Sequence, residues 1–403
     1  MTKHDFISTN VSKIDSSIRK SHVPGSWEVV CGVGGYIELT DNHVLMEPNM
    51  NNPLKTYTMA VGDVRGMNTH VWTPQLKLSG VQEAVNNTPG TVTLLGRSGT
   101  GKTVCVSDRI TRDTFVAVSS EIYITQLFIC RSRRLKSWVR DLQNNARTDL
   151  NKEYMPTINY QLLDEFVQKM EERVYGQYSV DRPRDHCLPR LKINFQKFSK
   201  LYKDMDKKRH GCSLDPLVIW TQIKSFIKGS LEAVLSGMPL TLKAYLDEKV
   251  FSPKRVRLTQ KQRKEVYKVY ECYADSLSVD GKPYWDEATR VLEILKISQL
   301  KPLDACVLLP TGHYGGNYDK IYVDEVQDNT QSEIILFVLA AGMNTNSLFL
   351  AGDPAQSVEE GVEFRFEEVR TIVYELTKGT AKIEHPLQLT VNYRSTHGIL
   401  NCA

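Results

Sequence analysis

A phosphate-binding loop carries the clearest chemistry in this sequence. Residues 96–103 satisfy the pattern G-x-x-x-x-G-K-[ST]. Glycines adopt backbone angles that other residues avoid, so successive N–H groups can turn towards a phosphate chain at the positive end of the following helix. We predict a nucleotide site in which Lys102 contacts the β- and γ-phosphates and Thr103 binds Mg²⁺. The residues predicted to bind the nucleotide here are Gly96, Arg97, Ser98, Gly99, Thr100, Gly101, Lys102 and Thr103.

The segments on either side of the loop predict the elements that position it. Residues 91–95 form an apolar, β-branched run, which predicts a strand that ends at the loop and a helix that starts after it. A second strand is predicted over residues 124–130, and a basic helix follows from Arg131. Because strands that alternate with helices pair in parallel, we expect an α/β fold with a parallel sheet.

An acidic run follows an apolar strand later in the chain. Asp324, Glu325 and Asp328 lie in the sequence D-E-V-Q-D, directly after the apolar residues 321–323. Carboxylates at the carboxyl end of a parallel strand lie in the crevice where such sheets bind ligands. We predict that Asp324 holds Mg²⁺, directly or through water, and that Glu325 orients and deprotonates the water that attacks the γ-phosphate. Taken alone, the run fits a solvated acidic turn at least as well.

Two polar residues further along fit the same chemistry. Gln356 lies in residues 352–357, after an apolar strand, where its amide can contact a γ-phosphate. Arg394 lies in residues 392–395 and can donate two parallel hydrogen bonds to phosphate oxygens, as an arginine finger does. An isolated arginine is more often a surface charge, so spacing alone leaves the role of Arg394 open.

Composition excludes several classes of protein. The 403 residues have a net charge of +4, with 24% charged and 41% hydrophobic residues, which describes a soluble globular chain without a general preference for polyanions. The eight cysteines form no C-x-x-C pair, so we expect reduced thiols and no zinc site. No signal-peptide core and no run of about 18 apolar residues occurs. We expect an intracellular protein, nuclear or cytoplasmic, with no membrane partner.

Changes of pattern along the chain divide it into four predicted regions. Short β-like runs at residues 27–30 and 35–39 alternate with turn formers. Apolar positions recur at helical spacing over residues 160–167, which predicts a helical insert around them. The predicted regions are a small mixed N-terminal region of unknown role (1–75), the first part of the α/β domain (76–150), the helical insert (151–315) and the rest of the α/β domain (316–403).

The order of these motifs resembles the ATP-binding domain of superfamily 1A, UvrD-like helicases. Residues 78–85 resemble the Q motif, and residues 96–103, 324–328, 352–357 and 391–395 resemble motifs I, II, III and IV. The form D-E-x-Q-D is the discriminating one, because another branch of the superfamily carries D-E-x-x-Q. Within the family, the chain resembles most the UvrD-like domain of the large tetratricopeptide- and ankyrin-repeat-containing proteins.

This resemblance implies that the chain is the ATP-binding half of a nucleic-acid motor. It implies a P-loop NTPase (RecA-like) sheet interrupted by a helical, 1B-like insert, with ATP and Mg²⁺ as cofactors and Gln82 as the residue that recognises adenine. Gln356 and Arg394 would act with Glu325 in catalysis and couple the γ-phosphate to domain movement. The sequence ends at Ala403, just after motif IV. The second RecA-like domain is therefore expected in the full-length protein, and residues 1–403 alone are not expected to unwind a duplex.

Single-stranded nucleic acid, either DNA or RNA, is the partner that the resemblance implies. Arg131, Arg133 and Arg134 follow the second predicted strand, where members of the family contact the strand backbone, and Phe364 lies near the position of a stacking aromatic. The segments 190–209 and 254–264 are also rich in cations. The aromatics among the cations of the first segment fit either a strand-binding surface or the core stripe of an amphipathic helix.

Three functions therefore compete. The first is an ATP-dependent helicase or translocase, and the second is a nucleotide-dependent switch or scaffold that binds ATP without unwinding. A P-loop kinase or GTPase is disfavoured, because the sequence has no N-K-x-D base-reading motif and D-E-V-Q-D has no role in those enzymes. Stimulation of ATP hydrolysis by nucleic acid separates the first two.

Overall fold

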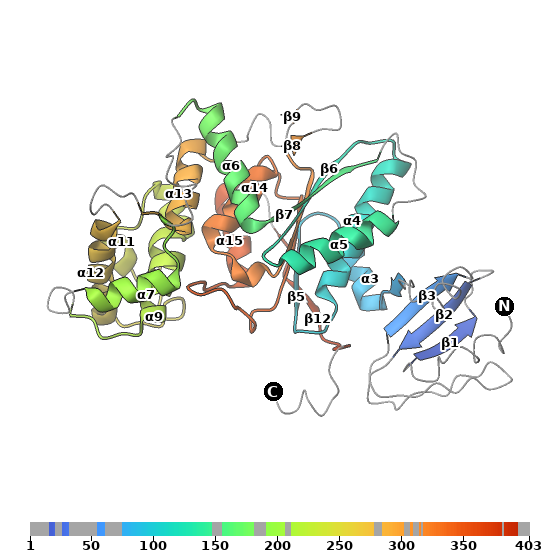
Figure 1. The fold of residues 1–403 in the computed structure, drawn as a ribbon, viewed down its shortest axis with the longest axis horizontal. Helices are drawn as coiled ribbons and strands as arrows, with labels where there is room; N and C mark the ends of the chain where they lie inside the picture. Colours follow the sequence, from blue (N-terminus) through green and yellow to red (C-terminus); the bar gives the residue numbers. More distant parts are fainter. Residues whose placement is uncertain are drawn as a thin grey trace. The chain divides into compact units, whose positions relative to one another are not determined.

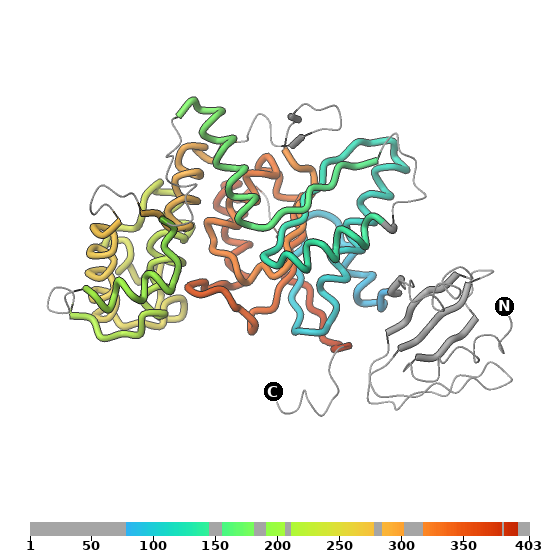
Figure 2. Tube along the Cα trace, viewed as in Figure 1, coloured from blue at the N-terminus to red at the C-terminus, as the bar shows by residue number. Residues whose placement is uncertain are grey.

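The structure is a computed structural model (Figure 1). Its contacts divide the chain into two compact units. One unit comprises Met1–Thr88, Leu94–Arg109 and Leu387–Ala403, and the other comprises Pro89–Thr93 and Ile110–Pro386. The phosphate loop belongs to the first unit and the acidic run to the second. The structure describes residues 16–20, 26–31, 55–60, 75–146, 155–180, 191–205, 211–277, 284–301, 307–308, 314–315, 317–380 and 383–393 (Figure 2).

A small antiparallel sheet lies in the first unit. β2 and β3 pair from Ser26 opposite Ala60 to Cys31 opposite Lys55. The β-like run predicted at residues 27–30 lies within β2, whereas the run predicted at residues 35–39 lies outside the described residues. The strands follow one another in sequence order: β1 (Ser16–Lys20), β2 (Ser26–Cys31), β3 (Lys55–Ala60) and β4 (Gln75–Lys77).

A six-stranded parallel sheet forms the α/β fold and confirms the predicted fold class. Its order is β12-β5-β11-β10-β6-β7, and β10 pairs in parallel with both β6 and β11. In this register Ile321 lies opposite Leu127 on one side and Leu348 on the other. The strands are β5 (Val92–Gly96), β6 (Thr125–Cys130), β7 (Thr157–Leu162), β10 (Lys320–Asp324), β11 (Leu348–Gly352) and β12 (Leu387–Leu389).

The strands β6 and β11 are buried at every residue, which explains why most of their side chains are apolar. A parallel sheet is covered on both faces, so its inner strands need apolar side chains on each side. α14 is likewise buried along its whole length. The helices that follow the strands are α4 (Lys102–Ser119) after β5, α5 (Arg133–Ala146) after β6, α6 (Leu163–Gln177) after β7, α14 (Gln331–Ala340) after β10 and α15 (Phe366–Leu376) after β11.

The helix expected over residues 160–167 begins later than its pattern predicts. Residues up to Leu162 form β7, which pairs with β6, and α6 begins at Leu163. The Glu165 carboxylate accepts the N–H of Leu162 at 2.9 Å, so it stabilises the first turn of α6. The apolar spacing therefore continues across the boundary between β7 and α6. Strand pairing and the helix cap set the position of this boundary.

A further group of helices lies between α6 and β10 in the sequence (Figure 1). Among them, α13 packs against both α6 and α14, so it joins this group to the helices that follow the sheet. The group comprises α7 (Phe195–Asp204), α9 (Pro216–Thr221), the π-helix η4 (Gln222–Lys228), α10 (Leu231–Ser236), α11 (Leu242–Leu246), α12 (Gln260–Ser276) and α13 (Glu287–Ser298).

The aromatics of segment 190–209 belong to the core of this group. The ring of Phe198 lies 4.9 Å from that of Trp220 and 5.4 Å from that of Tyr273, measured between centroids. Phe198 and Tyr202 are buried. The structure therefore supports the amphipathic-helix interpretation of α7 and not a surface on which these two rings stack bases.

Two cations of segment 254–264 also make contacts within this group of helices. The Arg255 guanidinium binds Glu232, with Nη1 2.7 Å from Oε1. Arg263 is buried, with its guanidinium 4.8 Å from the ring centroid of Tyr245. Both cations stabilise the packing between helices of this group.

No helix that the structure describes is both long enough and apolar enough to cross a membrane.

Candidate functional site

The phosphate loop connects β5 to α4 in the first unit. Thr100 closes the turn, because its N–H and its Oγ1 both donate to the Arg97 carbonyl, at 3.2 and 2.8 Å. Gly99 and Gly101 have φ angles of +80° and +90°, which residues with side chains rarely adopt. A Cβ atom on Gly101 would lie 2.4 Å from Gln82 Nε2. The loop therefore needs glycine at these positions to keep the backbone shape of a phosphate cradle.

Lys102 begins α4 and reaches back over the loop. Its side chain is buried, and its Nζ lies 3.4 Å from the Arg97 carbonyl oxygen, which is the long limit of a hydrogen bond. A phosphate held by the loop would offer this ammonium a charged and stronger partner. Thr103 lies next to it in the first turn of α4, at the positive end of the helix dipole. These two side chains fit a triphosphate and the Mg²⁺ that accompanies it.

Gln82 fastens the loop to α3 (Gly80–Asn87). Its Oε1 accepts the Ser79 N–H at 2.9 Å, and Ser79 Oγ accepts the Gln82 N–H at 3.4 Å, which makes a capping box. Its Nε2 donates to the Thr100 carbonyl at 3.1 Å. A side-chain amide has two N–H groups and two acceptor lone pairs, so these contacts leave capacity for the base contact predicted from the sequence.

Two residues near the end of the described chain also hold the loop, and no role was predicted for them from the sequence. Asn392 Nδ2 donates to the Ser98 carbonyl at 2.6 Å, and the Tyr393 N–H donates to the Gly99 carbonyl at 2.8 Å. Both belong to the motif that contains Arg394, which itself lies outside the described residues. Membership of this motif was the signal that the sequence offered for these two residues, because contacts with backbone carbonyls produce no sequence pattern.

Asp324 and Glu325 end β10 in the second unit. Asp324 is buried, and one of its carboxylate oxygens accepts the Glu325 N–H at 3.1 Å. Glu325 has φ 60° and ψ 46°, a left-handed conformation that residues other than glycine seldom adopt. Such backbone conformations persist where neighbours hold them, and they occur often at functional sites. The buried carboxylate of Asp324 suits metal binding. The carboxylate of Glu325, which is held in a fixed direction, suits the acceptance of a proton.

Gln327 fixes the direction of the Glu325 carboxylate. Its Nε2 donates to Glu325 Oε2 at 2.6 Å, and its Oε1 accepts the Asp353 N–H at 2.9 Å. Gln356 follows on the same loop and is exposed, with its N–H donating to the Asp353 carbonyl at 3.0 Å. The side chain of Gln327 thus connects the acidic run to the loop that carries the predicted phosphate sensor, a role that the sequence analysis did not assign.

Arg131 is engaged with acidic groups and does not present a free cation. Its Nη2 donates to the Asp328 carbonyl at 2.6 Å and lies 3.5 Å from Glu333, and its Nη1 lies 3.4 Å from Glu359. Burial acts to lower the pKa of Arg131, but these two carboxylates raise it above its ordinary value. Burial raises the pKa of Glu333 in spite of the guanidinium beside it. The arrangement differs from the strand contact predicted for Arg131, since a phosphate would have to displace these partners.

The remaining predicted nucleic-acid residues are accessible. Arg133 and Arg134 are exposed in the first turn of α5. Phe364 is half-buried, and its ring packs edge-to-face on Phe366 with centroids 5.0 Å apart. The charges of these arginines and the positive end of the helix dipole both attract phosphate, so together they attract it more strongly than either would alone.

Comparison with known proteins identifies a family and a relative. Residues 79–373 match the family model described as UvrD/REP helicase N-terminal domain. The human protein named TPR and ankyrin repeat-containing protein 1 is 33% identical over 248 residues. That alignment covers 58% of this chain and 8% of the relative, so the chain spans a small part of the relative's length. The family match includes the phosphate loop, the acidic run and Gln356.

Proposed function

Because the chain belongs to the UvrD/REP helicase family, we propose that it is the ATP-hydrolysing half of a motor that moves along single-stranded nucleic acid. The observation that carries the proposal is the phosphate loop, with its two left-handed glycines and with the Lys102 ammonium 3.4 Å from the Arg97 carbonyl. This ammonium is buried, and the partner that the described residues offer it is a weak, neutral carbonyl, as expected of a group that awaits an anion.

In the proposed bound state, the N–H groups of the loop and the Lys102 ammonium neutralise the charge of the β- and γ-phosphates. Thr103 and Asp324 would hold Mg²⁺, which would supply positive charge to the phosphate oxygens. Each charge-assisted hydrogen bond of this kind contributes about 1.5–3 kcal/mol. Gln82 keeps the loop in shape and reads the adenine.

Hydrolysis is assigned to Glu325. Its carboxylate orients a water molecule and accepts the proton as the water oxygen attacks the γ-phosphorus. The bond from this phosphorus to the β–γ bridging oxygen breaks, and ADP and phosphate leave. The hydrogen bond from Gln327 and the left-handed backbone keep the carboxylate in one direction, which reduces the entropy that the step would otherwise cost. Gln356 senses the γ-phosphate, and Arg394 would supply charge to the transition state together with a second RecA-like domain.

Stimulation by nucleic acid tests the proposal. ATP hydrolysis by the purified protein is measured with and without single-stranded DNA or RNA, in parallel with Glu325→Gln as the inactive control. The proposal expects single strands to raise the rate and the variant to stay inactive in both conditions. Equal rates with and without nucleic acid would contradict movement on a strand.

A switch or scaffold that binds ATP without unwinding is the second candidate. The ion pairs of Arg131 favour it, because the cation expected to contact the strand is bound to Glu333 and Glu359. In that case ATP binding orders an interface with another protein. Nucleotide binding that is unaffected by any single strand would support this candidate over the first.

A further inference from the structure

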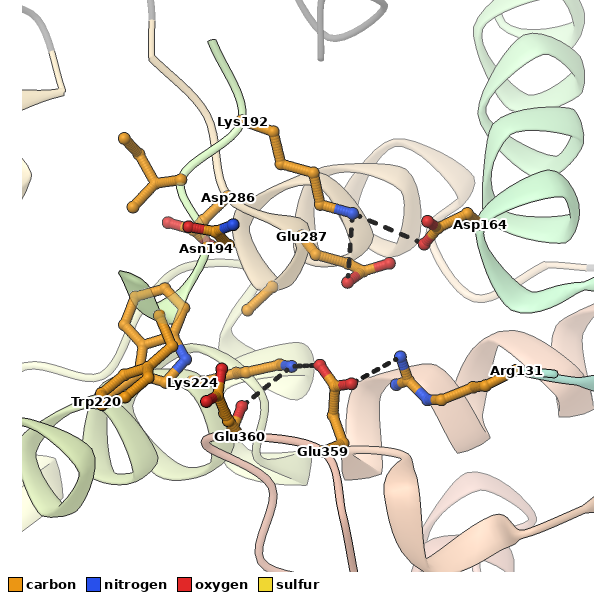
Figure 3. A pocket seen from close by; sticks show the side chains of 13 residues that line it. Arg131, Asp164, Lys192, Asn194, Trp220, Lys224, Asp286, Glu287, Glu359 and Glu360 are labelled. Carbon is orange, nitrogen blue, oxygen red and sulfur yellow. Dashed lines mark hydrogen bonds and ion pairs between the residues drawn. The ribbon is translucent and has the colours of Figure 1, made fainter. Parts of the chain in front are cut away.

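Glu359 joins the sheet to the helical group within the second unit (Figure 3). One of its carboxylate oxygens, Oε1, lies 2.7 Å from Lys224 Nζ, and the other, Oε2, lies 3.4 Å from Arg131 Nη1. Lys224 belongs to η4 and its side chain is 6% exposed, whereas Arg131 directly follows β6. A single carboxylate therefore bridges two cations that come from different parts of the unit.

The loop that carries Glu359 is also attached to the acidic run. Asp328 Oδ1 accepts the N–H groups of Val358 and Glu359 at 2.9 and 3.3 Å, and the hydroxyl of Ser357 at 3.3 Å. Arg131 donates to the carbonyl of the same Asp328 at 2.6 Å. A displacement of the acidic run or of the loop after β11 is thus passed to Glu359 through short, directional contacts.

On the other side, the loop is attached to η4. Ser225 Oγ donates to the Gly361 carbonyl at 2.7 Å and accepts the Glu363 N–H at 2.9 Å. Gly361 has a φ of +85°, and a Cβ atom there would lie 2.4 Å from the Trp220 ring. π-Helices are rare and often occur at functional sites. The loop and the π-helix therefore form one closely fitted pair.

A cavity of about 190 Å³ lies beside these contacts (Figure 3). Across it, Lys192 Nζ lies 3.5 Å from Asp164 and 3.6 Å from Glu287. Arg131 Nε is buried and has no hydrogen-bond partner among the described residues. Protein interiors are normally close-packed, so this space and this spare donor give the ion pairs room to rearrange.

We propose that Glu359 is a positioning residue that transmits the state of the nucleotide site to the helical group. When Gln356 and the acidic run respond to the γ-phosphate, the loop moves Glu359, and Glu359 moves Lys224 and Arg131 because it is bound to both. The helical group and the start of α5 then change position together with the nucleotide. This inference rests on the proposed function, since it requires ATP to bind.

Amide hydrogen exchange tests the coupling without requiring hydrolysis. Exchange is measured with and without Mg²⁺ and a non-hydrolysable ATP analogue, in the wild type, in Glu359→Gln and in Glu360→Gln. The Glu360 side chain is exposed, so the last variant is a control that removes the same charge one residue away. In the wild type we expect the nucleotide to change exchange in residues 96–103, 353–361 and 222–228.

In Glu359→Gln we expect the response of residues 222–228 to be lost while the other two segments still respond, and Glu360→Gln should resemble the wild type. Stimulation of ATP hydrolysis by single strands should fall about tenfold in Glu359→Gln, a size typical of coupling between sites. If that variant does not fold, Lys224→Met removes the same ion pair from its other side.

The outcomes separate the two proposals. A response in residues 96–103 and 353–361 that never reaches residues 222–228, or that reaches them equally in Glu359→Gln, would overturn the coupling and leave the nucleotide site intact. No response in residues 96–103 of the wild type would overturn the proposed function, and the coupling with it.

Discussion

The amide of Gln327 is hydrogen-bonded to the carboxylate of Glu325, with Nε2 2.6 Å from Oε2. The same amide accepts the N–H of Asp353 through Oε1 at 2.9 Å. One side chain thus fixes the proposed general base and ties it to the loop that holds Gln356. Gln327 is therefore assigned a different role from the residues that bind the nucleotide, because it acts by orienting the carboxylate of Glu325.

Gln327→Leu keeps the volume of the side chain and removes both hydrogen bonds. We expect the kcat for ATP hydrolysis to fall by up to about 10²-fold, the cost of misplacing a reacting group, with little change in the KM for ATP. Steady-state kinetics check this, with the exposed Gln196 on α7 changed to Leu as the control. A rise in KM at unchanged kcat would show that Gln327 acts in binding and not in aiming Glu325.

Glu325→Gln removes the proton acceptor but retains a side chain that Gln327 can bind. Hydrolysis should fall by about 10²-fold or more, as is usual when a general base is lost, while affinity for ATP is retained. Single-turnover hydrolysis and equilibrium binding of ATP are measured together. Wild-type hydrolysis by this variant would make Glu325 part of a solvated acidic turn.

The inner strands could be predicted from the sequence because each contains a mostly apolar run next to a turn or a motif. β5, β6, β10 and β11 all lie where those runs predicted them. The edge strand β7 was not predicted, although its residues alternate strictly between polar and apolar, which is the pattern of a half-buried strand. The helical spacing of residues 160–167 overlaps the end of this strand. Here strand pairing with β6 outweighs the local pattern.

The sequence motifs predicted the residues that do the chemistry of the site, but they did not predict the contacts that support these residues. Arg131 meets Glu333 and Glu359, which lie about two hundred residues later in the chain, and no spacing rule links residues so far apart. Asn392 supports the phosphate loop through a backbone carbonyl, which any residue offers. Side-chain identity predicts chemistry, whereas these contacts depend on the tertiary fold.

Arg133 and Arg134 are predicted to bind the phosphates of single-stranded nucleic acid. Changing both to Gln should weaken single-strand binding and reduce the slope of log K against log salt by about 0.7 for each phosphate that is no longer neutralised. Fluorescence anisotropy with a labelled oligonucleotide at several salt concentrations measures this slope. Changing the exposed Lys243 and Lys249 to Gln is the control, and we expect that pair to leave the slope unchanged. An unaltered slope in the arginine variant would place the strand elsewhere.

Asp286 links stability to pH in the helical group. Burial acts to raise its pKa, but the Lys228 ammonium and hydrogen bonds from Thr289 and Tyr273 hold the pKa below the ordinary value of 3.8. A carboxyl with a lowered folded-state pKa stabilises the fold above its unfolded pKa, and this stability is lost as the pH falls through the folded pKa. The stabilisation is therefore present at neutral pH and disappears in acid.

Asp286→Asn should lower the free energy of unfolding at pH 7 by about 3–5 kcal/mol, because it leaves the buried Lys228 without a partner. The difference from the wild type should shrink at pH values below 3.8, as the wild-type carboxyl becomes protonated. Urea unfolding at both pH values measures it, with the exposed Asp204→Asn as the control. A difference that stays constant with pH would mean that the ion pair contributes nothing to stability.

Calorimetric titration of Mg²⁺-ATP into the wild type and Lys102→Ala tests the central claim most directly. Removal of a charge-assisted hydrogen bond worth about 1.5–3 kcal/mol should weaken binding by roughly tenfold or more. The variant should keep the wild-type unfolding midpoint, and Lys169→Ala, which changes an exposed lysine on α6, should bind as the wild type does. Equal affinity of wild type and Lys102→Ala for ATP would contradict the assignment of residues 96–103 as the nucleotide site.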